Sequence, residues 1–404
     1  MRARARGKRA VERDELVLDA ALMETALHGV DQLGMVAVAR RAGLTAGSVY
    51  SRHENVAELL VAIWLERCAR PTLDLVTGAV NRALGVDSQD FGRAPFADIA
   101  GVTGVAGVDV LMRRSAAVVV GVEILAIARR HPELAEEVVP ALEEILRWHD
   151  RTDLERARIA TLLGLVLGCV VHGGSSAVDV DRWRSVFGLV VDAVAVAPST
   201  PPTEWNPARG RAVRADTGEP LRDALLDATC AVIARSGLVA ATNSRIARRA
   251  GLTPGAVYTR YDAKDDLVID TMRSLLDDAI GDNEPVTSGL DSAERMGHAA
   301  AQLLSRGGGD ERRPWLRFRL EMYLVATHRR DLAAVLDEIH EIGRRRYEEM
   351  LAPAGLRTDV AGWVALVGQS IPLGLAILDC YAPGIESIDF RPVALPLLAA
   401  VAAS

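Results

Sequence analysis

Three side chains that can donate hydrogen bonds to nucleic acid follow one another closely in the second half of the chain. They are the Tyr258 hydroxyl, the Arg260 guanidinium and the Lys264 ammonium. A tyrosine or lysine donor can bind a phosphate oxygen, and arginine can bind a phosphate or the edge of a guanine. The residues just before them, 254–256, are small enough to allow close approach to bases and phosphates. This pattern predicts a contact surface for double-stranded DNA.

Two short helices joined by a glycine turn should position these donors. Thr242 can cap a helix over residues 243–249, because its hydroxyl can accept a hydrogen bond from a first-turn amide. Gly251 permits a turn with positive φ. Thr253 can cap the next helix, and Pro254 suits its first position. Helix, turn and helix is the arrangement that places a second helix in the major groove.

The same segment occurs earlier in the chain. Residues 39–52 read ARRAGLTAGSVYSR and residues 247–260 read ARRAGLTPGAVYTR, with 11 of 14 positions identical at a shift of 208 residues. A solenoid repeats about every 20–50 residues, so a period of half the chain indicates duplication of a whole domain. One chain is therefore expected to carry two DNA-reading heads, which is normally the property of a dimer.

The repeated residues resemble the TetR family of bacterial transcriptional repressors. Its heads follow the order Ile-Ala, Ala-Gly, Tyr, Phe, Lys and Leu, matched in the second copy by Ile246, Ala247, Ala250, Gly251, Tyr258, Tyr261 (an aromatic for Phe), Lys264 and Leu267. The matches in the first copy are Val38, Ala39, Ala42, Gly43, Tyr50 and Leu59. That copy departs with His53 for the aromatic and Val56 for the lysine, and Gly34 stands where Thr242 would cap. The first head is therefore predicted to be the more weakly equipped one.

The resemblance implies that both heads contact an operator. The candidate residues in the first head are Thr45, Ala46, Gly47, Ser48, Tyr50, Arg52 and His53. Those in the second head are Thr242, Asn243, Arg245, Thr253, Pro254, Gly255, Ala256, Tyr258, Arg260, Tyr261 and Lys264. Basic residues also precede each head: Arg2, Arg4, Arg6, Lys8 and Arg9 in the first, and Arg209, Arg211 and Arg214 in the second. They could form flexible arms that reach the minor groove or screen phosphates, or equally well solvated tails.

The composition and the residue periodicity predict an all-α protein of two tandem TetR-like units. Half of the residues are apolar, and alternating β-branched runs are missing. Apolar residues at helical spacing open each head: Leu16, Ala20, Met23 and Leu27 before Gly29, and Leu221, Leu225, Ala228 and Val232 before Gly237. We expect a basic arm at 1–13, heads at 14–60 and 221–268, helical regulatory and pairing bodies at 61–197 and 269–404, and a Pro-rich extended linker at 198–220.

By the resemblance, the bodies bind an inducer and pair through their last two helices. Small residues such as Gly164, Gly168, Gly368 and Gly374 would let the segments 156–171, 181–196, 360–379 and 388–401 approach closely, although an ordinary core would look similar. Pairing would make an intramolecular pseudo-dimer, with further self-association left open. For a small-molecule pocket the candidates are Trp315, Phe318, Met322, Tyr323, Tyr347 and Trp363. The first body offers Met112, Glu123, Trp148, His172 and Trp183, with less focus.

Several other kinds of protein are disfavoured. The net charge of −7 argues against a globally basic coat, and no apolar run is long enough to predict a membrane span. The four cysteines are far apart, which favours buried free thiols in a cytoplasmic protein over metal or disulfide use. No catalytic motif appears, so neither an enzyme nor a cofactor is expected; the acidic residues 277–282 only faintly suggest a metal site. The alternative function is a helical small-molecule-binding or interaction protein with a degenerate first head.

Overall fold

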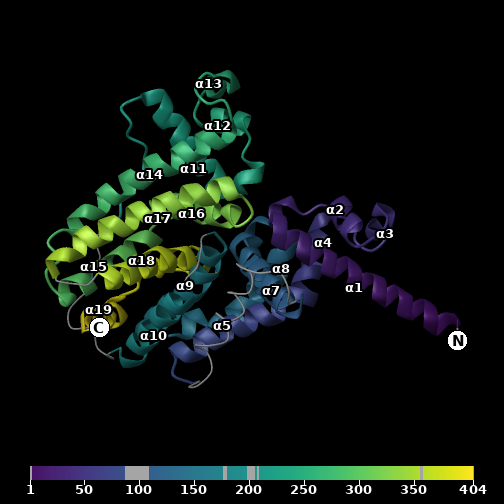
Figure 1. The fold of residues 1–404 in the computed structure, drawn as a ribbon, viewed down its shortest axis with the longest axis horizontal. Helices are drawn as coiled ribbons and strands as arrows, with labels where there is room; N and C mark the ends of the chain where they lie inside the picture. Colours follow the sequence, from purple (N-terminus) through teal and green to yellow (C-terminus); the bar gives the residue numbers. More distant parts are fainter. Residues whose placement is uncertain are drawn as a thin grey trace.

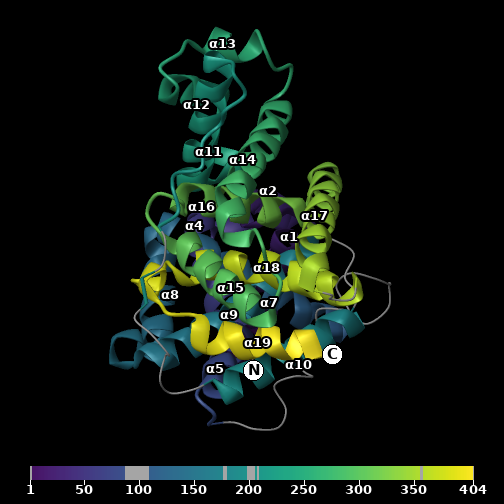
Figure 2. The same ribbon diagram turned by 90° about the vertical axis from the view of Figure 1, so that its left-hand side faces the viewer.

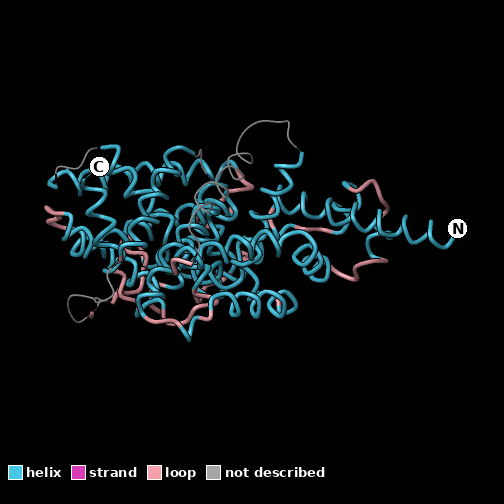
Figure 3. The backbone as a smooth tube through the Cα atoms, turned by 90° about the horizontal axis from the view of Figure 1, so that it is seen from below, coloured by secondary structure: helices cyan, strands magenta, loops and turns pink. Residues whose placement is uncertain are grey.

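The computed structural model describes residues 2–86, 109–175, 180–197, 205–206, 209–354 and 358–403. Side chains are described within these ranges except at 2–10, 109–115, 173–175, 180–186, 354, 358–359, 361 and 363. Helices and connecting loops make up all of this described chain, with no strand (Figure 3). The predicted all-α class is confirmed.

Each half consists of a small helical head followed by a longer helical body. The first half contains α1 (Arg2–His28), α2 (Met35–Arg41), α3 (Ala46–Tyr50), α4 (Val56–Ile63), α5 (Ala69–Ala83), α7 (Asp109–Ile127), α8 (Pro132–Leu146), α9 (Asp153–Ser175) and α10 (Val180–Val196). The second contains α11 (Pro220–Ala240), α12 (Asn243–Arg249), α13 (Pro254–Tyr258), α14 (Lys264–Thr287), α15 (Ala293–Gly308), α16 (Arg313–Ala326), α17 (Arg330–Leu351), α18 (Thr358–Leu378) and α19 (Arg391–Ala403). The two heads project from different sides of the bodies, α2 and α3 at the right and α12 and α13 at the top of Figure 1.

A helix runs from each head into its body. In the second half this is α14, which is unbroken from Lys264 to Thr287. In the first half α4 continues into α5 through one π-helical turn, Trp64–Cys68. The boundaries predicted near residues 60 and 268 therefore fall inside continuous helical segments.

The first helix of each head shows where periodicity alone was insufficient. In α11, Leu225, Ala228 and Val232 are buried as predicted, while Leu221 is 40% exposed. In α1, Ala20 is buried and Met23 is partly buried as predicted, but Leu16 and Leu27 are 50% and 47% exposed, and Val17 is the fully buried residue near the start. Val17 corresponds to Leu225 at the 208-residue shift, so the two heads use the same buried face.

The two halves meet in the middle of the molecule along α9 and α18 (Figure 1). A Cβ added to Gly374 would overlap the carbonyl group of Gly164, and one added to Gly168 would overlap the carbonyl group of Ser370. The two backbones are therefore in direct contact, which only residues without a side chain allow at these positions. The flanking helices α10 and α19 pack against each other at the base of the molecule in Figure 2.

Polar contacts also cross between the halves. The Trp148 indole N–H donates to the carbonyl of Pro383 at 2.9 Å, and the Tyr381 hydroxyl donates to the carbonyl of Leu125 at 2.6 Å. His172 Nδ1 lies 3.0 Å from the Ser370 hydroxyl. Since these groups are largely buried, the contacts satisfy polar atoms that would otherwise be desolvated without a partner.

The cysteines are free thiols, as the sequence predicts. All four cysteines are free; Cys68, Cys169 and Cys230 are buried and Cys380 is partly buried. Burial raises the pKa of each thiol, which favours the uncharged form. In the part of the chain that is described, no helix combines the length and the apolar character needed to cross a membrane.

Candidate nucleic-acid interface and ligand pocket

The second head has the expected two short helices and the expected turn. The Thr242 hydroxyl accepts from the Arg245 amide at 3.3 Å and caps α12. Gly251 has φ +73°, and Pro254 occupies the first turn of α13. Thr253 stands at the N-cap of α13 with an extended backbone, but its side chain makes no capping bond, so that predicted cap is wrong.

The first head has the same backbone, but its side-chain cap is on the second motif helix, α3, instead of the first, α2. Gly34 precedes α2 and makes no side-chain cap, as expected. The Thr45 hydroxyl instead accepts from the Ser48 amide at 3.2 Å and caps α3. Gly43 has φ +67°, matching Gly251 in the second head. The departures from the family pattern in this copy therefore leave its helix-turn-helix backbone intact.

The second helix of each motif presents a tyrosine to solvent. Tyr50 is 51% exposed and Tyr258 is 63% exposed, whereas the neighbouring Val49 and Val257 are fully buried. The small residues at the start of these helices are exposed or partly exposed; they are Ala46, Gly47 and Ser48 in one head, and Pro254, Gly255 and Ala256 in the other. Each head thus anchors its helix by one valine and leaves a hydroxyl and a small-residue surface open to a partner.

The two predicted DNA-contacting arginines have partners inside their own heads. Arg52 pairs with Asp14 and donates to the carbonyl of Ser48 at 2.6 Å. Arg260 pairs with Glu219. Both arginines therefore tie the end of the second motif helix to the start of the head, and a contact with DNA would require them to exchange a carboxylate for a phosphate. Their role in DNA binding stays a prediction.

Tyr261 and Lys264 lie in positions that support the head from within. The Tyr261 hydroxyl donates to Asp270 at 2.5 Å, and Arg222 binds the same carboxylate with two donors at 2.6 and 2.9 Å. The Lys264 ammonium donates to the carbonyl of Leu238 at 2.9 Å, and partial burial lowers the pKa of Lys264. Both side chains complete internal contacts in this structure, and the expected contacts of Tyr261 and Lys264 with DNA stay predictions.

The remaining predicted DNA-contacting residues of the heads are His53, Asn243 and Arg245. His53 occupies the position of Tyr261 and is partly buried, and desolvation lowers the pKa of His53. Asn243 is partly exposed, and Arg245 donates to the carbonyl of Ala240 at 2.7 Å. Sequence reasoning missed Arg222 and Asp270, because partners 48 residues apart leave no local signal.

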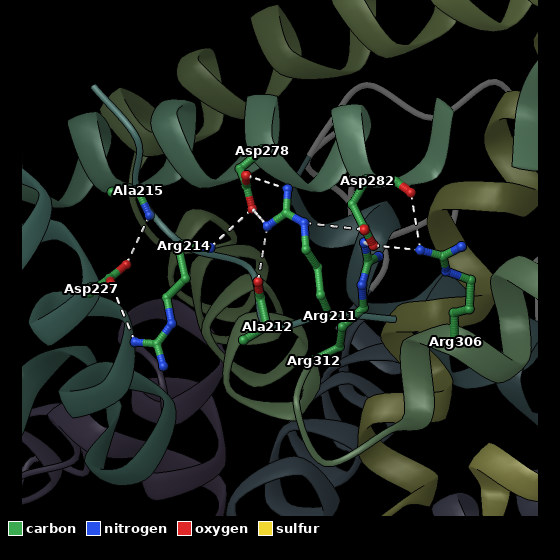
Figure 4. Close-up of polar contacts among 9 residues, drawn as sticks. All are labelled: Arg211, Ala212, Arg214, Ala215, Asp227, Asp278, Asp282, Arg306 and Arg312. Atoms are coloured by element: carbon green, nitrogen blue, oxygen red, sulfur yellow. Dashed lines mark hydrogen bonds and ion pairs between the residues drawn. The ribbon is translucent and has the colours of Figure 1, made fainter. Parts of the chain in front are cut away.

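The segment before the second head is bound to the protein surface, so a flexible basic arm is the wrong description there. The Arg211 guanidinium binds Asp278 at 2.6 and 2.7 Å and lies 3.3 Å from Asp282 (Figure 4). The Arg214 side chain lies 3.3 Å from Asp227, and Arg209 is exposed. The acidic residues 278 and 282 thus neutralise arginines, which explains their presence without a metal.

The other predicted terminal and linker segments are described only in part. Residues 2–13, expected as a basic arm, form the N-terminal part of α1. The side chains of Arg2, Arg4, Arg6, Lys8 and Arg9 lie outside the described residues. In the linker, the Trp205 indole donates to the carbonyl of Ile388 at 3.1 Å, and the Arg391 guanidinium stacks 4.7 Å from the Trp205 ring. Residues 198–204 and 207–208 are not described.

A cavity of about 250 Å³ opens among the helices of the second body. Three predicted ligand residues line it, Trp315, Tyr323 and Tyr347. Phe318 and Met322 are buried but do not line this cavity, and the side chain of Trp363, like those of Met112 and Trp183, is outside the described part. Sequence reasoning followed aromatic residues and therefore missed the polar lining residues, among them Arg319 and His340. Thr161 and Leu189 of the first half also contribute to the wall.

The comparisons with known proteins identify the family to which the repeated helix-turn-helix belongs. A family profile described as bacterial regulatory proteins of the tetR family matches residues 17–63 and again residues 225–271. The transcriptional regulator AqdR of Rhodococcus erythropolis is 32% identical over 175 residues, which is 42% of this chain and 76% of AqdR. The chain belongs to the TetR family. Its two profile matches make it a tandem of two TetR-like units.

Two further TetR-like relatives match over shorter stretches. The transcriptional repressor KstR2 of Rhodococcus jostii (strain RHA1) is 42% identical over 72 residues, 18% of this chain and 35% of KstR2. The regulator BetI of Rhizobium meliloti is 45% identical over 67 residues, 15% of this chain and 33% of BetI. This tandem TetR protein therefore spans only about a third of the length of those two relatives.

Two polar contacts join the halves of this TetR tandem where the heads meet the bodies. His328 Nε2 lies 3.4 Å from Glu123 Oε2, and Arg130 Nη2 lies 3.0 Å from Glu321 Oε1. Residues 122–134 and 320–332 align so that Glu123 corresponds to Glu321 and Arg130 to His328. The same contact is thus made twice, with arginine as the partner in one copy and histidine in the other.

A glycine near the end of each head's first helix contacts one of these side-chain pairs. A Cβ at Gly29 would lie 3.0 Å from the His328 ring and 3.2 Å from the Glu123 carboxylate, which accepts from the Val30 amide at 2.7 Å. A Cβ at Gly237 would overlap the Arg130 guanidinium. Gly29 and Gly237 have φ +88° and +76° and are equivalent at the 208-residue shift. Each of these contacts therefore connects one head to both bodies.

The buried Glu321 should give this junction a pH dependence. Burial raises the pKa of Glu321 from 4.5 to about 7, against the opposing effect of Arg130. Because the folded protein holds this proton more tightly than the unfolded chain, the group's contribution to stability is full below about pH 4.5 and is lost as the pH rises to about 7. We expect the advantage in unfolding midpoint of the wild type over Glu321→Gln to fall between pH 5 and 7.5, by the equivalent of about 2 kcal/mol.

Thermal unfolding followed by circular dichroism at each pH measures this difference. Glu338→Gln is the matched control, because Glu338 is half exposed and forms a surface pair with Arg273. Its difference from the wild type should stay nearly constant over the same range. Parallel pH curves for the wild type and Glu321→Gln would contradict the assignment of the proton to Glu321.

Proposed function

We propose that this TetR protein is a cytoplasmic transcriptional repressor that reads an operator with two covalently linked, non-identical heads and is released by a small-molecule ligand. The observation that carries the proposal is the duplicated helix-turn-helix with its exposed Tyr50 and Tyr258. Both heads sit on bodies whose last helices pack together, so the chain has the parts of a family dimer within one polypeptide. No catalytic role is proposed.

Pairing within one chain has consequences for DNA recognition. Two subunits of an ordinary homodimer are identical and suit a symmetric operator, but fused units can differ. The two heads differ in sequence at equivalent positions: the second has Tyr261 and Lys264 where the first has His53 and Val56. They also differ in which motif helix carries a side-chain cap. Both differences support two unequal half-sites. The close contact of α9 with α18 supports an intramolecular pseudo-dimer, in which tethering replaces a concentration-dependent association.

Two helices supply a route from the cavity to the second head. α14 lines the cavity with Ala279 and Asn283 and begins at Lys264 in the head. α16 lines it with Arg319 and contacts the Arg130 junction through Glu321. A ligand that shifts either helix would change the spacing of the heads, and the same coupling would make operator binding lower the affinity for ligand.

Selection of bound sequences from a random DNA pool with the full chain tests the proposal. We expect enrichment of two unequal half-sites whose centres are about 34–36 Å apart, or one helical turn, because two linked heads must enter successive major grooves. A single enriched half-site would mean that the first head does not read DNA. No enriched sequence would favour the alternative, a helical small-molecule-binding protein that keeps the heads as structural elements.

A further inference from the structure

Arg319 is unusual among the arginines of α16 and the loop before it. Arg312 pairs with Asp282, and Arg313 lies 2.9 Å from Asp379. Arg319 has no carboxylate partner among the described residues; its contacts there are the carbonyl of Gln369 at 3.5 Å and the face of the Tyr323 ring, 5.6 Å from the guanidinium carbon. Arg319 is therefore a partly buried lining residue of the cavity whose guanidinium has no anionic partner among the described residues.

The polar neighbours of Arg319 do not offset its charge. Burial, followed by the positive charge of Arg319, lowers the pKa of His340 to about 3, and the His340 ring contacts the Tyr323 hydroxyl. Burial likewise lowers the pKa of His172, whose ring centre lies 4.5 Å from that of His340. Both histidines are therefore neutral at physiological pH. This end of the cavity carries one uncompensated positive charge.

Most of the remaining lining residues are apolar; the polar ones include Asn283, Gln369 and Arg312, whose charge is paired with Asp282. The apolar lining includes Met296, Trp315, Leu316, Met350 and Leu397. Such a wall stabilises a hydrocarbon or ring system by removing it from water, and a single charged group fixes the orientation of the ligand. The required ligand thus has an apolar body and one anionic end.

We propose that the inducer is a hydrophobic carboxylate whose carboxylate binds Arg319 while its apolar part fills the space beside Trp315. This inference rests on the proposed ligand-controlled function and names the ligand class of that site. A guanidinium can bind a carboxylate with two parallel hydrogen bonds, which are stronger than bonds between neutral groups. Displacing a carbonyl contact as long as 3.5 Å requires little rearrangement.

Octanoate and octanol, which share an alkyl chain and differ in charge, are suitable probes for isothermal titration calorimetry on the full chain. We expect the wild type to bind octanoate at least tenfold more tightly than octanol. Arg319→Met should lose this preference and retain octanol binding, because only the charge is removed. Arg295→Met is the matched control, since the Arg295 side chain is 63% exposed and pairs with Asp291 on the surface. It should keep the full preference.

Arg319→Lys provides a second variant should Arg319→Met fail to fold, and it should retain part of the preference through its charge. Equal binding of the two probes, binding of neither, or a preference that survives Arg319→Met would overturn the proposed ligand class. Operator binding measured on the same preparation separates the two hypotheses. Intact operator binding with no octanoate preference removes only the ligand class, whereas octanoate binding without any enriched DNA sequence removes the repressor function.

Discussion

Replacing Gly374 with leucine is expected to lower the midpoint of thermal unfolding by roughly 5–10 °C. A side chain at this position would overlap the backbone of Gly164, and a rotamer change cannot relieve a clash with backbone atoms. The helices α9 and α18 would have to separate, which would open gaps between the halves along their whole contact. We expect a loss of about 3 kcal/mol of unfolding free energy or more.

Differential scanning calorimetry measures this effect, and Gly188→Leu is its control. Gly188 lies on α10 and is exposed, and a Cβ added there would have no neighbouring atom within 4 Å. The control should be neutral or slightly stabilising, because leucine favours a helix more than glycine does. If Gly374→Leu were as stable as the wild type, the direct backbone contact between the halves would be wrong.

Removing the two exposed tyrosines should have the largest effect on DNA binding. Loss of a hydrogen bond to a charged group costs about 1.5–3 kcal/mol, so Tyr258→Ala should weaken binding to the selected operator roughly 10- to 150-fold. Tyr50→Ala should have a comparable effect if the first head contributes equally. The effects should multiply in the double variant, since the two residues lie in separate heads.

Fluorescence anisotropy with a labelled operator measures these affinities, and circular dichroism checks that each variant is folded. Ile342→Ala is the control, because Ile342 is a 40%-exposed apolar residue of α17 in the second body. It should bind DNA like the wild type. An unchanged affinity in Tyr50→Ala alone would restrict DNA reading to the second head, and an unchanged affinity in the double variant would remove this surface from the mechanism.

The sequence alone determined the tandem architecture and the backbone of each head. The turn glycines, the Thr242 cap and the first-turn Pro254 act within a few residues of their own positions, so their effects could be predicted locally. Helical spacing also located the helices, although in α1 it assigned Leu16 and Leu27 to the buried face, where the structure buries Val17 and Ala20. Errors of this kind arise because several adjacent apolar residues satisfy the same period.

Only the tertiary structure decided which charges are neutralised and which remain available. Arg211 is held by Asp278, 67 residues away, and Arg260 by Glu219, while Arg319 meets no carboxylate in the described chain. The sequence shows three similar arginines, since an ion pair depends on distances that are set by the packing of helices remote in sequence. The same packing brought Glu123 to His328 and Glu321 to Arg130, and thereby connected both heads to both bodies.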